Sequence, residues 1–244
     1  MKRAPARVRR HGLARTLSKL GACSRTQAAQ YAREGRVAIN GRIVRDPEAP
    51  VDAGRDRIAI DGREIHAAER VYLMLNKPRG YVTTAADERG RETVYTLLED
   101  AGLPWVAPVG RLDKASEGLL LLTNDSAWAA RITAPESHVD KTYHVQIDRL
   151  PDAALLDALL SGVDEGDEHL GAKRAHELRR GEKNAWLEIV LDEGRNRQIR
   201  RLLAAHGVGV LRLVRVAIGP VALGALAKGA FRALDPEEVA ALAL

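Results

Sequence analysis

The 244-residue sequence contains a single cysteine, Cys23. One cysteine excludes a disulfide framework within the chain and a cysteine-rich zinc site, and it fits a reducing compartment, so we expect the protein to be cytoplasmic. No apolar run approaches the roughly 18 residues that a membrane-spanning helix requires, so we expect no membrane partner. The seven histidines are scattered, with no pair at metal-ligand spacing, and we predict no metal site.

Motifs of several common enzyme classes are also missing. The sequence has no Walker loop, no dinucleotide-binding fingerprint and no nucleophile elbow. Hydrophobic residues make up 45% of the chain, which is normal for a globular protein and sufficient for a sizeable core. Clues to function must therefore come from the charged residues.

The net charge of +5 is unevenly distributed along the chain. Residues 1–33 contain nine basic residues and no acidic one, so this segment carries +9 and the remainder carries −4. Of the 38 basic residues 30 are arginines, which suit bidentate phosphate contacts. Such a segment is typical of a phosphate-binding arm and face, and an Arg-rich transit peptide or a solvated tail is the alternative.

Composition divides the chain into four parts. We predict a basic, disordered arm over residues 1–12, where basic charge comes with little apolar periodicity. A compact module of two helices and two hairpins follows over residues 13–65. Residues 66–70 are polar and patternless, and we place a linker there. The remaining residues, 71–244, form a larger second domain.

Local signals define the elements of the small module. A short helix is predicted to stop at Gly21, and Ser24 with Gln27 three residues later forms the capping-box signature of a second helix. Asn40-Gly41 and Asp61-Gly62 each separate two short apolar stretches. These dipeptides accept the positive φ angles of tight turns, so each predicts a hairpin.

The second domain alternates strands and helices irregularly, with short turns between several strands. This pattern favours an α+β domain around a mixed, largely antiparallel sheet with flanking helices over a regular parallel fold. Strands are predicted at residues 71–75, 105–109, 119–122, 141–147, 186–191 and 210–218, and helices at residues 93–98, 126–132, 151–160, 197–203 and after Asp235.

Charge interrupts the apolar pattern of this domain at two places. Asp113 lies between the apolar stretches 105–109 and 118–122. Because a buried carboxylate is costly unless it is paired, Asp113 is either a structural ion-pair partner or a working group at a cleft. The second place is the start of the helix 197–203, which carries three arginines near the end that favours anions. They are Arg197, Arg200 and Arg201.

The stretch from Leu17 to Gly41 resembles the small RNA-binding module named after ribosomal protein S-four. In that family two helices present basic residues to structured RNA. The resemblance identifies six candidate RNA-binding residues, which are Arg15, Lys19, Arg25, Arg33, Arg36 and Arg42.

Four ordered motifs of the second domain resemble the pseudouridine synthases. They lie at residues 75–80, 110–125, 141–143 and 193–201. With the module that precedes them, they resemble the RsuA-type family of ribosomal-RNA pseudouridine synthases. The resemblance implies a reaction without cofactor or metal, in which a uridine within RNA loses its glycosidic bond, the uracil turns, and the sugar is rejoined to carbon-5.

The resemblance also assigns catalytic roles. Asp113 falls on the essential aspartate, which can act as a nucleophile, stabilise oxocarbenium character or abstract a sugar proton. Arg200 is expected to form an ion pair with Asp113 and to hold its orientation. Tyr143 is expected to stack on the flipped uracil and to assist proton removal at carbon-5.

Further residues are expected to contact RNA. Arg111 is expected to occupy the space that the extruded base leaves or to contact its phosphate, since base flipping costs a few kcal/mol. Lys77, Arg195 and Arg197 are weaker candidates for contacts to the RNA backbone.

The expected partner is ribosomal RNA, free or in pre-ribosomal particles, and the protein is expected to be a monomer. The amino-acid sequence of residues 195–198 favours ribosomal RNA of the large subunit over that of the small subunit. Two other functions stay open, namely a non-catalytic RNA-binding assembly factor of the ribosome and a synthase that acts on tRNA.

Overall fold

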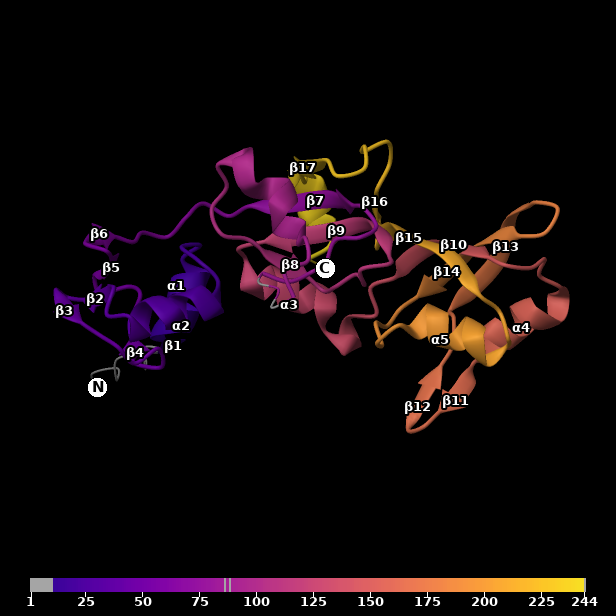
Figure 1. Cartoon of the computed structure of the whole chain (residues 1–244), viewed down its shortest axis with the longest axis horizontal. Helices are drawn as coiled ribbons and strands as arrows, with labels where there is room; N and C mark the ends of the chain where they lie inside the picture. The colour runs from indigo at the N-terminus through magenta and orange to yellow at the C-terminus, as the bar shows by residue number, and fades with distance from the viewer. Residues whose placement is uncertain (1–10, 86, 88, 244) are drawn as a thin grey trace, which may run out of the picture. The chain divides into compact units, whose positions relative to one another are not determined.

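The computed structural model describes residues 11–85, 87 and 89–243 (Figure 1). Contacts between Cα atoms divide it into two compact units. The first contains the described residues up to Val71 together with Ala101–Ala107 and Asn124–Ser126, and the second contains the rest. None of the described helices is long and apolar enough to cross a membrane.

The first unit begins with two helices, α1 (Leu13–Lys19) and α2 (Arg25–Arg33). The capping box predicted for α2 is confirmed, because the backbone N–H of Gln27 donates to Ser24 Oγ (3.1 Å) and that of Ser24 donates to Gln27 Oε1 (3.0 Å). These bonds satisfy backbone donors that the first turn of a helix leaves open.

A four-stranded antiparallel sheet completes this unit, with the order β3-β2-β5-β6. Asn40 and Asp61 both have φ of 51° in its two turns, so both hairpin predictions are confirmed. The strands are β2 (Val37–Ile39), β3 (Arg42–Ile43), β5 (Ile58–Ile60) and β6 (Arg63–Glu64).

The prediction of a disordered arm is wrong at its C-terminal end. His11–Gly12 form strand β1, which pairs antiparallel with β4 (Pro50–Val51). Strand pairing across such a distance in sequence is invisible to local composition, which is why the prediction failed there. The rest of the predicted arm, residues 1–10, lies outside the described residues.

The second unit is built on a mixed sheet with the order β13-β14-β10-β15-β9-β7-β17. Neighbours are antiparallel except β15 and β9, which are parallel, so the predicted α+β fold with a mostly antiparallel sheet is confirmed. The strands are β7 (Tyr72–Lys77), β9 (Glu117–Thr123), β10 (Lys141–Ile147), β13 (Arg174–Arg180), β14 (Ala185–Leu191), β15 (Val210–Ile218) and β17 (Phe231–Ala233), with β8 (Ala107–Val109) beside β9 and β16 (Val221–Ala222) beside β15.

Side chains alternate between the two faces of this sheet, so the strand registers assign each residue to a face. We call the face that carries Lys77, Gly118, Arg215 and Tyr143 the front face, since these residues pair in a continuous row across β7, β9, β15 and β10. The face that carries their immediate neighbours in sequence is the back face.

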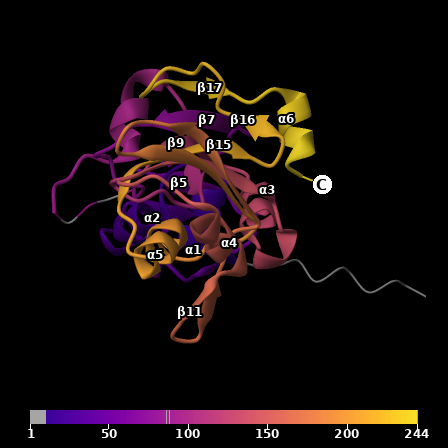
Figure 2. The ribbon, with the colours of Figure 1, turned by 90° about the vertical axis from the view of Figure 1, so that its right-hand side faces the viewer.

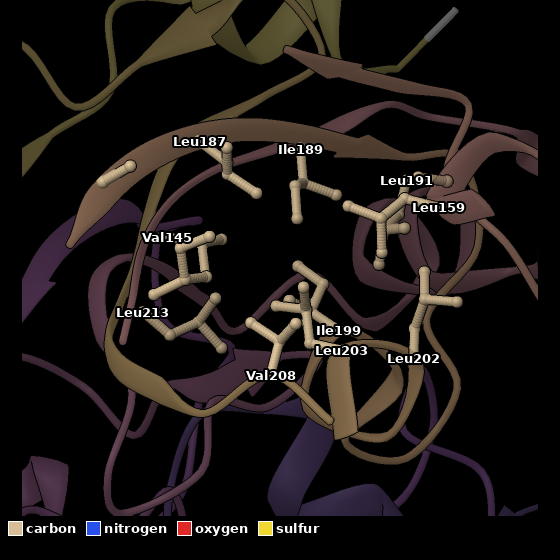
Figure 3. Close-up of a cluster of buried hydrophobic side chains, with 13 residues drawn as sticks. Val145, Leu159, Leu187, Ile189, Leu191, Ile199, Leu202, Leu203, Val208 and Leu213 are labelled. Atoms are coloured by element: carbon tan, nitrogen blue, oxygen red, sulfur yellow. The ribbon is translucent and has the colours of Figure 1, made fainter. Parts of the chain in front are cut away.

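Helices cover different faces in the two halves of the sheet. On the front face, Leu187 and Val145 pack with Ile199 and Leu203 of one helix and Leu159 of another (Figure 3). These helices are α5 (Gln198–Ala205) and α4 (Ala153–Ser161). On the back face of the β7 and β9 half, the apolar side chains pack against α3 (Ser126–Thr133) and α6 (Pro236–Ala241).

Several short elements connect these layers. A 3₁₀ helix over Val94–Ala101 replaces the helix predicted at residues 93–98, and a second one covers Pro135–Ser137. A hairpin of β11 (Val163–Glu165) and β12 (Glu168–Leu170) extends from the α5 side of the sheet (Figure 2).

Candidate active site

Asp113 lies in the loop between β8 and β9, and a buried lysine fixes the backbone of this loop. The Lys77 side chain is 0% exposed at the end of β7. Its Nζ donates to the carbonyl oxygens of Ser116 (2.8 Å), Asp113 (3.1 Å) and Pro78 (3.1 Å). An ammonium group has three donors, so all of them are in use.

Burial disfavours the charged form of Lys77. Desolvation lowers the pKa of Lys77 to about 8; the charges of Asp113 and Glu117 oppose this shift, and that of Arg215 adds to it. The prediction that Lys77 contacts the RNA backbone is wrong, because the ammonium has no exposed surface and no free donor. Lys77 instead positions the Asp113 loop from inside the protein.

The Asp113 carboxylate stays accessible, and its ion-pair partner is Arg197. Arg197 NH1 lies 3.4 Å from Asp113 Oδ2, and the two side chains are 49% and 35% exposed. Arg197 stands directly before α5 with φ of 50° and ψ of 30°, a left-handed conformation that is uncommon for arginine. A strained backbone and an accessible charge pair at one place are typical of a functional site.

The expected ion pair between Asp113 and Arg200 is not formed. Arg200 lies one turn further along α5, where NH1 donates to Val210 O and NH2 to Ala115 O, each at 3.3 Å. Arg200 Nε is buried and has no hydrogen-bond partner. Burial and the neighbouring Arg197 charge lower the pKa of Arg200, while Asp113 raises it. Arg200 therefore braces the loop backbone and lies within electrostatic range of Asp113 without binding its carboxylate.

Tyr143 lies on the front face of the sheet. Its strand register pairs it with Arg215, which pairs with Gly118, which in turn pairs with Lys77. The half-buried ring packs at the border of the apolar cluster under α5. Tyr143 is thus on the same face and at the same level as the lysine that holds the Asp113 loop.

Arg215 is a site residue that sequence reasoning missed. It is 5% exposed, its Nε donates to Leu119 O (2.8 Å), and its NH2 group is buried without a partner. Gly118 opposite has φ of +100°, and a Cβ atom there would collide with the Arg215 backbone, so this junction of two parallel strands requires glycine. The signal in the sequence was an arginine within the apolar run of β15.

Comparison with known proteins identifies the family of the chain. Residues 71–205, which include Asp113, Tyr143 and Arg197, match the family model described as RNA pseudouridylate synthase. The chain belongs to the RNA pseudouridylate synthase family. Residues 12–58 match the S4 domain, so both family resemblances of the sequence are confirmed.

Relatives that align over most of their length support membership of the same family. The chain is 38% identical over 228 residues to an uncharacterized RNA pseudouridine synthase of Aquifex aeolicus, covering 93% of this chain and 91% of the relative. It is 34% identical over 230 residues to ribosomal large subunit pseudouridine synthase B of Bacillus subtilis, covering 93% of each. A crystal structure of a pseudouridylate synthase matches with a TM-score of 0.66 and 32% identity, covering 95% of this chain and 99% of the other.

Acidic residues pair with Arg195 and Arg201, two further arginines around the start of α5 in this synthase. Arg195 Nε lies 2.8 Å from Glu193 Oε2, and Arg201 lies 2.7 Å from both Glu165 and Glu168 on the β11–β12 hairpin. These pairs anchor the turn before α5. The predicted RNA contact of Arg195 therefore has to compete with an existing ion pair. Among the residues that the structure describes, Arg197 forms an ion pair with Asp113 alone.

The S4 domain of the synthase presents its basic residues to solvent. All six candidates are exposed, namely Arg15, Lys19, Arg25, Arg33, Arg36 and Arg42. Arg36 is occupied, since it pairs with Asp61 (2.6 Å) and Glu34 (3.3 Å) and stacks on Tyr31. Within the described part of the chain, the other five form no ion pair with an acidic side chain, as a phosphate-binding surface requires.

Arg111 is also exposed, two residues before Asp113.

The residues that the structure describes contain no group of three or more His, Cys, Asp or Glu side chains placed to hold a metal ion.

Proposed function

We propose that this RNA pseudouridine synthase isomerises a uridine in ribosomal RNA of the large subunit, with Asp113 as the essential carboxylate. The observation that carries the proposal is the arrangement of Asp113, whose backbone is fixed by buried Lys77 while its carboxylate is exposed beside Arg197. The name of the Bacillus subtilis relative supports the large subunit as the source of the substrate.

The reaction requires an anionic group close to the sugar of the target nucleotide. The bond from uracil N1 to C1′ breaks, a bond from uracil C5 to C1′ forms, and the proton on C5 is released while N1 gains one. Positive charge develops at C1′ when the glycosidic bond breaks. A carboxylate there either attacks C1′ or stabilises that charge, as in glycosidases, and a third route removes a proton from the sugar.

Other residues of the site serve base flipping and orientation. The target base must leave the RNA stack before Asp113 can reach its sugar. In the proposed role, Arg111 fills the vacated space or binds the adjacent phosphate, and Tyr143 stacks on the flipped uracil. Arg197 orients the Asp113 carboxylate, the role that the family resemblance assigned to Arg200.

The S4 domain contributes affinity in this proposal. Its exposed, unpaired cations, among them Arg15, Arg25 and Arg33, bind phosphates and release counterions, so their contribution depends strongly on salt. The second domain then selects the uridine. We propose that the protein acts as a monomer in the cytoplasm, on free rRNA or on pre-ribosomal particles.

Pseudouridine mapping tests the proposed function. Ribosomal RNA from cells that lack this protein is mapped by chemical modification and primer extension, with wild type or Asp113→Asn supplied in trans. One large-subunit site should disappear and should return only with wild type. Persistence of every rRNA site, with loss of a site in tRNA or of none, would contradict the ribosomal assignment.

A further inference from the structure

One half of the back face of the sheet is left open. Figures 1 and 2 show α4, α5 and the β11–β12 hairpin on one side of β13, β14, β10 and β15, and the contacts of α4 and α5 with Leu187 and Val145 identify that side as the front. On the back, the side chains of His176 and His144 are 56% and 37% exposed. This surface is separate from the site around Asp113, which lies on the front face.

A row of stacked side chains crosses this open surface. The strand registers place Arg179 opposite Trp186, Trp186 opposite Gln146, and Gln146 opposite Arg212. The guanidinium carbons of Arg179 and Arg212 lie 4.7 Å and 5.5 Å from the centre of the half-buried Trp186 ring. Both distances are within the range of cation–π attraction. Guanidinium groups from both ends of the row therefore stack on the indole ring.

Charge on this surface is positive, in contrast to the net −4 of residues 34–244 as a whole. Glu188 lies between the two histidines, and Glu117 is 4% exposed at the rim, where it pairs with both Arg212 and Lys228. These two carboxylates face four cations, which are Arg174, Arg179, Arg212 and Lys228.

The composition of the surface favours a nucleic acid over a protein. The core of a stable protein interface is depleted in charged residues and rich in apolar ones, whereas the rows around Trp186 offer guanidinium, imidazole and amide groups. Phosphates pair with arginine, and unstacked bases pack on aromatic rings or guanidinium planes. Positively charged surfaces that also carry aromatic side chains bind single-stranded RNA with little sequence preference.

We infer that the open half of the back face, built around Arg179, Trp186 and Arg212, is a second RNA-binding surface. It takes a single-stranded segment of the substrate RNA, remote from the uridine that enters at Asp113, with phosphates on Arg174 and Arg179 and a base packed on the outer guanidinium plane of the row. The inference rests on the proposed function only in taking RNA as the substrate.

Binding measurements with two RNAs test this surface. The variant Arg174→Glu/Arg179→Glu is compared with Arg131→Glu/Arg149→Glu, which makes the same charge change at exposed positions outside the open surface and outside the Asp113 loop. The first variant should bind long rRNA fragments about tenfold more weakly than wild type. The slope of log affinity against log salt concentration should fall by an amount that corresponds to about two released counterions. A short hairpin around the target uridine should be bound and converted as by wild type. Equal losses for both variants, or no loss for the first, would overturn the inference.

Fluorescence of Trp186 tests RNA binding at this row of side chains. Single-stranded RNA should quench the emission of wild type, and Trp186→Phe, which keeps an aromatic ring on the sheet, should lose most of this quenching. Unchanged quenching in Trp186→Phe would contradict RNA binding at this row of side chains. If wild type shows the quenching but converts no uridine in any RNA, the proposed function fails while the RNA-binding surface stands.

Discussion

Asp113 is held in two contrasting ways. The backbone of its loop accepts hydrogen bonds from Lys77. This side chain is 0% exposed, and its three donors bind backbone carbonyl oxygens at 2.8–3.1 Å. Its carboxylate meets Arg197, which is 49% exposed and makes one contact of 3.4 Å. The position of the residue is thus part of the fold, while the partner of its carboxylate is exchangeable. This difference suits a site in which the incoming RNA competes for Arg197 and the loop must not move.

Lys77→Met gives the largest expected effect on stability. The variant keeps an apolar chain of similar length but leaves the buried carbonyls of Asp113, Ser116 and Pro78 without their donor, so the free energy of unfolding should fall by about 3 kcal/mol. Urea denaturation measures it. Lys114→Met, an exposed change in the same loop, is the control and should stay within about 0.5 kcal/mol of wild type. A similarly small change in the free energy of unfolding for Lys77→Met would show that the hydrogen bonds of Lys77 do not stabilise the fold.

The pH dependence of stability tests whether Lys77 is buried in the folded protein. The pKa of Lys77 is about 8 in the folded protein, against an ordinary value of 10.5 for a lysine in the unfolded chain, so between these values the unfolded chain binds more protons. Raising the pH through this window should therefore increase the free energy of unfolding, by about 2 kcal/mol. The rise should be absent in Lys77→Met. Parallel pH curves for the two proteins would mean that Lys77 keeps an ordinary pKa.

Arg197→Gly tests the ion pair between Arg197 and the Asp113 carboxylate. Glycine accepts the left-handed backbone at this position, so the variant removes only the side chain. Because exposed ion pairs contribute little, the free energy of unfolding should stay within about 0.5 kcal/mol of wild type. Turnover at saturating RNA should fall about tenfold, equivalent to about 1.4 kcal/mol of barrier. Full activity would show that the orientation of Asp113 does not depend on Arg197.

Elements encoded locally were predictable from the sequence. Ser24 and Gln27 cap α2, and Asn40-Gly41 and Asp61-Gly62 turn two hairpins, because each signal acts within four residues. Strand β13 was missed because its edge position leaves charged side chains on both faces and hence no apolar alternation. Strand β17 was missed because three residues gain their order only from pairing with β7.

The site was predictable in its residue types but not in its contacts. Family motifs named Asp113, yet whether Arg197 or Arg200 reaches it depends on where α5 begins and on the left-handed backbone of Arg197. Lys77 was predicted only as a weaker candidate for contacts to the RNA backbone. The alternation of β7 from Leu73 and Leu75 placed it on the buried side, and that signal could have revealed its role.

The most direct test of the account is a single-turnover assay with the mapped RNA and Asp113→Asn. Asparagine keeps the size of the side chain and removes its charge, and Lys77 still holds the backbone. The account predicts that the variant folds and binds the RNA with the affinity of wild type but forms no pseudouridine. Formation of pseudouridine by Asp113→Asn at the wild-type rate would contradict the role of this carboxylate.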